Sequence, residues 1–285
     1  MELARRLGAE IVVVDSMTVY RGMDVGTAKP TPEEREAVPH HLLDVAEPLE
    51  PFSVARFQSL AGRATSGITF RGRPVLMVGG SGLYFRAVVD RLELPGTDHR
   101  LRSWLEAEAR ALGHQALHAR LADLDPLAAA KIEPSNTRRT VRALEVAALT
   151  GRPFSSFAAA WDRYPEGRVR AAGVAIPTAA LRERIESRVR TMLDGGLVQE
   201  VRGLLDRGLG PRVTASQAIG YLEVVEHLAG RLTIAEMVER MVRRTRDLAR
   251  RQMAWFRRDP RIRWFDAGSE GAMSAVDEIE EYLRG

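Results

Sequence analysis

Short runs of aliphatic residues alternate along the chain with stretches in which apolar positions recur every three or four residues. The first run, residues 11–14 (IVVV), is apolar on both faces, as in a buried strand of a parallel sheet. Residues 73–80 (RPVLMVGG) predict a second short buried strand, and residues 170–176 predict a third that returns the chain to the same sheet. Helical spacing lies between them, for example over residues 52–68. This alternation predicts an α/β fold with a parallel sheet flanked by helices.

The middle of the chain has a different pattern. After a break at Leu94–Gly96, alanine, leucine, arginine and glutamate dominate and strand patterns are nearly absent. We therefore expect an all-helical insertion over residues 99–171, within an α/β core formed by residues 1–98 and 172–285. The helices expected inside the insertion are 101–112, 115–123, 126–131 and 137–150.

Polar residues follow the first two predicted strands. Asp15 and Ser16 come directly after the first strand, and a Gly-Gly-Ser turn ending at Ser81 follows the second. Ligands of open α/β sheets bind beyond the carboxyl ends of the strands. Asp15 could accept a proton or hold a cation there, or it could simply cap the next turn. The glycine turn would offer backbone N–H groups and a hydroxyl to an anion, on the same side of the sheet.

Composition narrows the class of protein. The chain has 285 residues, 45% of them hydrophobic, which is enough for a full core. It has no apolar run of membrane-spanning length and no basic-then-apolar leader, so we expect no membrane association. The absence of cysteine excludes disulfides and thiolate metal sites and fits a cytoplasmic protein.

Arginines are concentrated in a few segments although the net charge is only +4. Residues 237–258 predict one long helix with eight arginines and two acids, which favours RNA or another phosphate-rich ligand. Arg184 and Arg188 lie four apart on a predicted helix, so both could reach one phosphate group, unless neighbouring glutamates neutralise them. A further cluster spans residues 138–142, where Glu145 could instead act as a local partner.

Two adjacent histidines, His40 and His41, stand before Leu42 in the sequence PHHLLD. Adjacent side chains point in different directions on a helix or a strand, so they make a poor pair of metal ligands. We expect a structural or substrate-edge role for them and no protein metal site.

Six motifs in succession resemble those of the tRNA dimethylallyltransferases, also called tRNA isopentenyltransferases. The resemblance runs in order from Met1 to about Asp266. The motifs are DSMTVYRGMDVGTAKP, PHHLLD, VGGSGLYFRAVV, RRTVRALEV, QAIGY and RRQMAWFRR.

The resemblance implies a fold, a reaction and its partners. Members have a P-loop-kinase-like α/β core and a helical insertion that grips the anticodon stem-loop of tRNA. They transfer a dimethylallyl group from dimethylallyl diphosphate to N6 of the adenosine 3′ of the anticodon, in tRNAs reading codons that begin with U. Mg²⁺ is held mainly through the diphosphate. We expect a monomer.

Site residues follow from matching positions. Asp15 matches the general base of the family, and Ser81 stands where the family usually has threonine, keeping the hydroxyl near the leaving diphosphate. Arg188, with Arg184 beside it, matches the arginine that holds the diphosphate. The positions that match tRNA contacts are Asp15, Ser16, Met17, Thr18, Arg102, Arg138, Arg139, Thr140, Val141, Arg142, Gln217, Ala218, Ile219, Gly220, Tyr221, Leu222, Arg250, Arg251, Gln252, Met253, Ala254, Trp255, Phe256 and Arg257.

One family motif is absent from these 285 residues. Members carry a strand and a Gly-x-Thr-x-x-Gly-Lys-Ser/Thr loop before the helix that ends as ELARRLG here. We expect either a misassigned start or a truncated relative, and a genuine loss would leave an inactive tRNA-binding remnant. A third alternative is an enzyme acting on free nucleotides. The arginines of the insertion and of residues 250–257 argue against it, because binding a mononucleotide does not require so extensive a positively charged surface.

Overall fold

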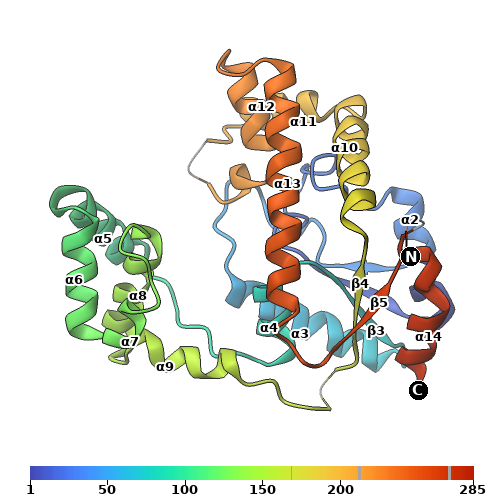
Figure 1. Ribbon diagram of the computed structural model, residues 1–285, viewed down its shortest axis with the longest axis horizontal. Helices are drawn as coiled ribbons and strands as arrows, with labels where there is room; N and C mark the ends of the chain where they lie inside the picture. Colours follow the sequence, from blue (N-terminus) through green and yellow to red (C-terminus); the bar gives the residue numbers. More distant parts are fainter. Residues whose placement is uncertain (168, 211–212, 269–270) are drawn as a thin grey trace. The chain divides into compact units, whose positions relative to one another are not determined.

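The computed structural model describes residues 1–167, 169–210, 213–268 and 271–285. The chain forms two compact units (Figure 1), which we call the core unit (residues 1–89 and 166–285) and the helical unit (residues 90–165). Among the described residues, no helix combines the length and the apolar character needed to cross a membrane.

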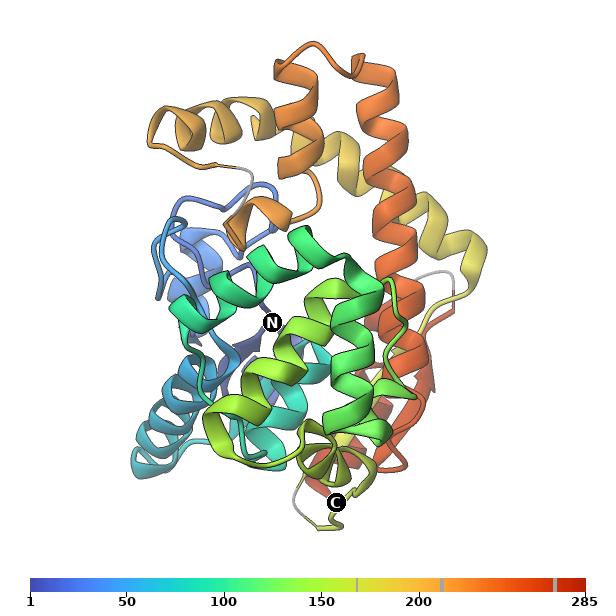
Figure 2. The same cartoon turned by 90° about the vertical axis from the view of Figure 1, so that its left-hand side faces the viewer.

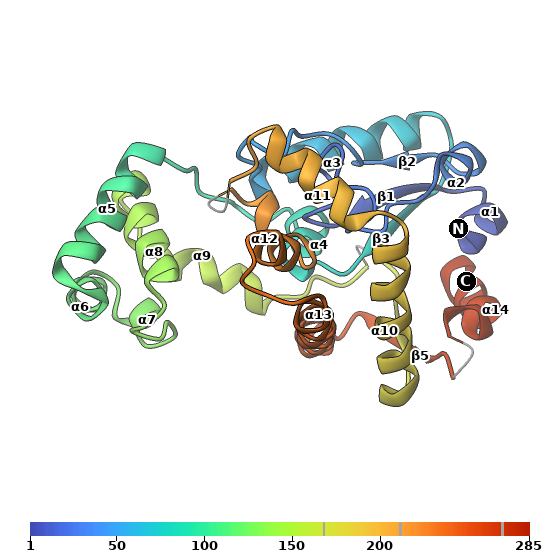
Figure 3. The ribbon, with the colours of Figure 1, turned by 90° about the horizontal axis from the view of Figure 1, so that it is seen from above.

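A three-stranded parallel sheet lies in the core unit. Its order is β2 (His40–His41), β1 (Glu10–Val14) and β3 (Val75–Gly79), so β1 is central and largely buried, as its apolar run predicts. Helix α3 (Val54–Phe70) packs along β1 and β3 (Figure 3). The prediction that β3 is also buried is wrong. It is an edge strand of this sheet, and Val78 is 46% exposed.

Strand β4 (Ala171–Ala175) does not return the chain to this sheet, contrary to the sequence prediction. It pairs in parallel with β5 (Ile262–Asp266) in a separate two-stranded sheet. The ring of Trp264 covers β4 so closely that a Cβ at Gly173 would lie 2.6 Å from the ring. The sequence predicted a strand over residues 170–176, but not which strand edge it would pair with.

Local sequence explains where the helices of the core unit begin and end. Gly8 ends the first helix in the left-handed conformation, with φ of 62°. Thr31 and Thr233 each form a capping box with a glutamate three residues later. The remaining helices of this unit are α1 (Glu2–Leu7), α2 (Pro32–Ala37), α4 (Gly82–Val89), α10 (Thr178–Asp194), α11 (Leu197–Asp206), α12 (Tyr221–Leu228), α13 (Ile234–Phe256) and α14 (Val276–Arg284).

The long helix α13 runs beside α10 and α12, as Figures 1 and 3 show. Its buried residues Met237 and Met241 join the main apolar core, which also contains the β1 residues Val12 and Val14. Burial of such side chains contributes roughly 1.5–3 kcal/mol each and fixes the helix on the core unit.

The helical unit has its own apolar core, built from Leu105, Leu121 and Leu144 among others (green helices in Figure 2). It begins at Asp90 and ends at Pro165, whereas the sequence placed these boundaries at residues 99 and 171. The helices are α5 (His99–Leu112), α6 (His114–Leu124), α7 (Pro126–Ala129), α8 (Thr137–Thr150) and α9 (Phe154–Ala158).

Its early boundary has a physical reason. Arg142 on α8 donates hydrogen bonds to the carbonyl oxygens of Pro95 and Gly96, at 2.7 and 2.9 Å. Arg152 also pairs with Glu93, so the extended segment before α5 is tied to the helices. The predicted α/β fold with a helical insertion is confirmed.

Candidate active site at the strand ends

The carboxyl ends of β1 and β3 lie next to each other. Val14 pairs with Gly79 in the ladder, so Asp15 and Gly80 leave neighbouring strands at the same edge of the sheet. This confirms that both polar turns lie on one side of the sheet. A Cβ at Gly79 would lie 2.0 Å from the Val14 carbonyl oxygen, so this close approach requires glycine.

Asp15 is half-buried and caps the turn after β1. Its Oδ1 accepts hydrogen bonds from the backbone N–H groups of Met17 and Thr18, at 2.7 and 3.1 Å. Its second carboxylate oxygen accepts no hydrogen bond from any described residue. Capping and proton acceptance are therefore compatible, because each can use a different oxygen.

A neutral hydroxyl lies near this carboxylate. Burial is the main cause that raises the pKa of Tyr84, on α4, and the charges of Tyr20 and Asp15 raise it further. Tyr84 consequently stays protonated near neutral pH and can donate a hydrogen bond. Sequence patterns gave no indication of this residue, because it occupies an ordinary core-facing position of a helix.

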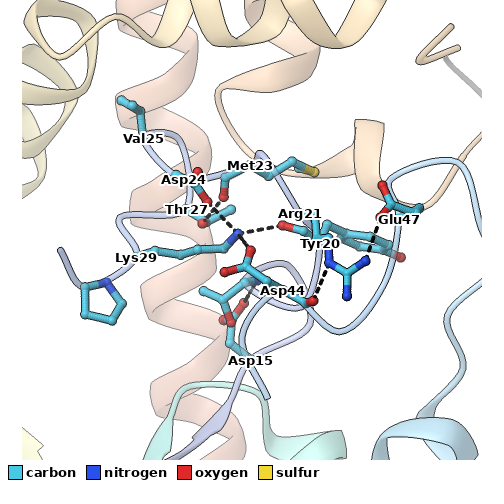
Figure 4. Close-up of polar contacts among 12 residues, drawn as sticks. Asp15, Tyr20, Arg21, Met23, Asp24, Val25, Thr27, Lys29, Asp44 and Glu47 are labelled. Atoms are coloured by element: carbon cyan, nitrogen blue, oxygen red, sulfur yellow. Dashed lines mark hydrogen bonds and ion pairs between the residues drawn. The ribbon is translucent and has the colours of Figure 1, made fainter. Parts of the chain in front are cut away.

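Lys29 fixes the loop that follows Asp15 (Figure 4). Its ammonium group donates to the carbonyl oxygen of Tyr20 at 2.6 Å and pairs with Asp24 and Asp44 at 2.7 and 2.6 Å. The side chain is 1% exposed. Arg35 pairs with the other oxygen of Asp44. The lysine of the GTAKP motif is thus a buried clamp inside the loop.

Glu200 on α11 holds the same loop from outside. Its carboxylate accepts hydrogen bonds from the backbone N–H groups of Asp24, Val25 and Gly26, at 2.7, 2.8 and 3.2 Å. The Tyr221 hydroxyl donates to the same carboxylate at 2.5 Å. Glu200 is separated from Gly26 by 174 positions in the sequence, so no local pattern could have identified this contact.

The glycine turn after β3 is covered by α13. A Cβ at Gly80 would lie 2.3 Å from Nε2 of Gln252, and one at Gly82 would lie 2.2 Å from the ring of Trp255. Phe256 forms an edge contact with Phe85 of α4, with ring centroids 5.9 Å apart. The glycines of the VGGSG motif are required by this packing as well as by the strand ladder.

The two arginines predicted to hold diphosphate lie on α10. Arg188 is exposed and has no ion pair with a described residue. The guanidinium of Arg184 lies against Gly271, where a Cβ would be 2.0 Å from it. The contacts between described residues do not bring either arginine to Asp15.

Some arginines of α13 have acidic partners among the described residues and others do not. Arg240 and Arg244 approach the buried carboxylate of Glu223, which also accepts the Gly220 N–H. Arg250 pairs with Asp247. The remaining arginines of the helix and its end are exposed and have no ion pair with a described residue: Arg243, Arg246, Arg251, Arg257 and Arg258.

In the helical unit, Glu145 is fully buried and pairs with Arg102 at 2.6 Å and Arg142 at 2.7 Å. The local-partner alternative therefore applies to Arg142. Arg138 and Arg139 remain exposed on the same helix, while Thr140 and Val141 are buried.

Burial also divides the predicted tRNA segment from Gln217 to Leu222. Ala218 and Tyr221 are buried, and Gln217 is exposed. Burial of the Tyr221 phenol is the main cause that raises its pKa, and its hydrogen bond to Glu200 raises it further. This tyrosine therefore supports the loop as a neutral donor.

At the opposite end of β1, Glu10 accepts hydrogen bonds from Arg71 at 2.6 Å and contacts His41 Nε2 at 2.7 Å. The Arg71 hydrogen bonds are the main cause that lowers the pKa of Glu10 to about 2, against the opposing effect of burial, and His41 lowers it further. Of the two roles that the sequence left open for His41, structural or substrate-edge, this contact is a structural one. Among the described residues, no group of three acidic, histidine or cysteine side chains could hold a metal ion.

Comparison with known proteins identifies the family. Residues 18–259 match the model of the family described as IPP transferase. The chain is 53% identical over 272 residues to a tRNA dimethylallyltransferase of Salinispora tropica, an alignment that covers 95% of this chain and 85% of the relative. The chain belongs to this family.

Solved structures agree. The full-length tRNA isopentenylpyrophosphate transferase of Bacillus halodurans is 41% identical, with a TM-score of 0.71, and covers 100% of this chain and 90% of its own. A eukaryotic dimethylallyltransferase solved while acting on tRNA is 25% identical, with a TM-score of 0.76 over 97% of this chain and 71% of its own. Membership of this family of prenyltransferases confirms the resemblance found in the motifs.

Proposed function

We propose that this chain transfers a dimethylallyl group from dimethylallyl diphosphate to N6 of the adenosine 3′ of the anticodon, in tRNAs reading codons that begin with U. The observation that carries the proposal is the family match over residues 18–259. Further support comes from the free oxygen of Asp15, which lies at the same sheet edge as the Gly80–Gly82 turn.

Asp15 is proposed as the general base. An exocyclic amine of adenine is a weak nucleophile, because its lone pair is delocalised into the ring. A carboxylate that takes the N6 proton while the carbon–nitrogen bond forms lowers this barrier. The oxygen of Asp15 that is not engaged with Met17 and Thr18 is suited to this role.

The glycine turn is proposed to hold the leaving diphosphate, because negative charge grows on it as the allylic bond breaks. Backbone N–H groups, the Ser81 hydroxyl and the guanidinium groups of Arg184 and Arg188 would stabilise that charge. The Ser81 hydroxyl supplies an oxygen atom, the donor type that Mg²⁺ prefers, so the turn fits a metal held mainly through the diphosphate. Bound Mg²⁺ would neutralise part of the leaving-group charge.

The tRNA anticodon stem-loop is proposed to contact the exposed arginines of α13 and α8. Arg251, Arg257, Arg138 and Arg139 can neutralise backbone phosphates. Extruding an adenosine from a loop costs less than extruding it from a duplex, because no base pair is broken.

A transfer assay tests the proposal. Purified protein, unmodified tRNA, labelled dimethylallyl diphosphate and Mg²⁺ should yield labelled tRNA, with the label on one adenosine after nuclease digestion. Free AMP serves as competitor and should not accept the group. Binding of tRNA without any transfer would instead support the inactive tRNA-binding alternative.

A further inference from the structure

Helix α13 presents two different faces within residues 250–257. Gln252, Trp255 and Phe256 are spaced by three and four residues, so they share one face, and all three are half-buried. Arg250, Arg251 and Ala254 are exposed. The segment that resembles a single tRNA-contacting block is therefore divided by helix geometry.

The inward face covers the glycine turn at the strand ends. Nε2 of Gln252 is the nearest atom to the Cβ position of Gly80, at 2.3 Å, and the Trp255 ring covers Gly82 at 2.2 Å. Between these two glycines lies Ser81, whose carbonyl oxygen begins α4 by accepting the Phe85 N–H. Gln252 and Trp255 thus bracket the turn from the side of α13.

The amide of Gln252 has unused hydrogen-bonding capacity. It makes no hydrogen bond to any described residue although it is half-buried. An amide in such a place is most stable when a ligand or an ordered water completes its hydrogen bonds. The turn beneath it presents backbone N–H groups, which attract an anion.

Resting on the proposed function, we propose that Gln252 is a diphosphate-contacting residue and Trp255 a positioning residue for the Gly80–Gly82 turn, and that neither is a tRNA contact. The Gln252 amide donates a hydrogen bond to an oxygen of the diphosphate. Trp255 holds the turn in the conformation that aims its N–H groups at the same anion. The exposed arginines on the other face of α13 bind RNA.

Binding and kinetics with matched variants on the two faces test this inference. Gln252→Leu removes the amide and keeps the side-chain size, so inorganic pyrophosphate should bind about 10- to 100-fold more weakly, as expected for one hydrogen bond to a charged group. The KM for dimethylallyl diphosphate should rise accordingly. The Kd for tRNA and its salt dependence should stay unchanged. Arg251→Ala, at the neighbouring position on the outward face, should weaken tRNA binding and its salt dependence. It should leave pyrophosphate affinity and the KM for dimethylallyl diphosphate unchanged.

Trp255 provides a second measurement that does not depend on turnover. Pyrophosphate binding should change the intrinsic fluorescence, and Trp255→Phe should abolish most of that change while keeping an aromatic ring on Gly82. Trp255→Leu should weaken pyrophosphate binding, and Trp255→Phe should largely restore it.

The outcomes separate the two proposals. Wild-type protein that transfers the prenyl group while Gln252→Leu leaves pyrophosphate affinity unchanged would overturn this inference and leave the proposed function intact. So would a Gln252→Leu variant that loses tRNA affinity instead. Failure of the wild-type protein to bind pyrophosphate would also overturn it, whereas pyrophosphate binding without transfer would count against the proposed function alone.

Discussion

At the scale of a single residue, Asp15 combines an observed capping role with the proposed role of general base. One oxygen holds the turn after β1, and the other accepts no hydrogen bond from the described residues. A substitution that removes the whole carboxylate would disturb both tasks, so the choice of variant decides what an experiment can show.

Asp15→Asn keeps an oxygen that can accept from Met17 and Thr18 and removes the base. Transfer should fall by roughly 10²- to 10⁴-fold, the usual contribution of a general base. The Kd for tRNA, measured by filter binding, should change less than about twofold. Asp194→Asn, at an exposed position on α10, is the control and should transfer normally. An Asp15→Asn protein that keeps wild-type turnover would remove the base assignment.

Arg251 provides a second prediction at this scale. It is exposed and has no ion pair with a described residue, so Arg251→Ala should weaken tRNA binding without destabilising the fold. The slope of the logarithm of the binding constant against the logarithm of the salt concentration should become shallower by about 1, which corresponds to one fewer released counterion. Arg63→Ala, at an exposed position on α3, is the matched control and should leave the slope unchanged. Equal slopes for all three proteins would indicate that Arg251 contacts no phosphate.

At the scale of elements, the loop between β1 and α2 is held by packing as well as by charge. A Cβ at Gly26 would lie 2.4 Å from the ring of Tyr221 and 2.8 Å from a methyl group of Leu197. Both neighbours are fully buried, so neither can move aside cheaply.

Gly26→Ala should therefore destabilise the core unit by about 1–3 kcal/mol, the range for overpacked sites. Gly62→Ala on α3 is the control. It has open space around its Cβ position and should be neutral or slightly stabilising, since alanine favours a helix. Urea denaturation of both variants measures the difference in their free energies of unfolding. Equal midpoints would show that the Tyr221 ring can move aside to accept the added methyl group.

The sequence predicted most elements because their signals are local. Thr31, Ser53 and Gly8 belong to the residue types that usually cap helices and do so here, and the apolar run of β1 is buried as its pattern indicates. Pairing of β4 was not predictable, because an apolar run does not specify which strand edge it joins.

The candidate site was likewise only partly predictable from the sequence. The placement of Asp15 beside the glycine turn follows from the parallel strands that precede them, so the sequence alone could predict it. The contacts of Glu200 with Gly26 and of Gln252 with Gly80 join segments more than 170 residues apart. Only a folded chain reveals such contacts, because no spacing rule relates their positions.

At the scale of the whole molecule, acid stability depends on a buried carboxylate. The side chain of Glu10 is 5% exposed and its pKa is lowered from an ordinary 4.5 to about 2, chiefly by Arg71. Because the folded-state pKa lies below the unfolded value, this group stabilises the protein fully above about pH 4.5. Its contribution is lost as the pH falls towards about 2.

Glu10→Gln should lower the free energy of unfolding near neutral pH by roughly 1–3 kcal/mol, because Arg71 loses a charged partner. The difference from wild type should shrink steadily as the pH falls from about 4.5 to about 2. Glu36→Gln, at an exposed position without a described partner, should show no such convergence. Denaturation curves at several pH values test this, and parallel stability profiles for Glu10→Gln and wild type would contradict it.

The contact between α1 and α14 has a consequence for how the protein is made. Arg6 pairs with Asp277 and Glu280, and Leu3 packs on a cluster that includes Ile279. Ribosomes synthesise α14 after every other helix described here, so the Leu3 side chain of α1 lacks this cover until α14 has left the ribosome. Chains truncated before Val276 should therefore be products that chaperones retain and proteases remove.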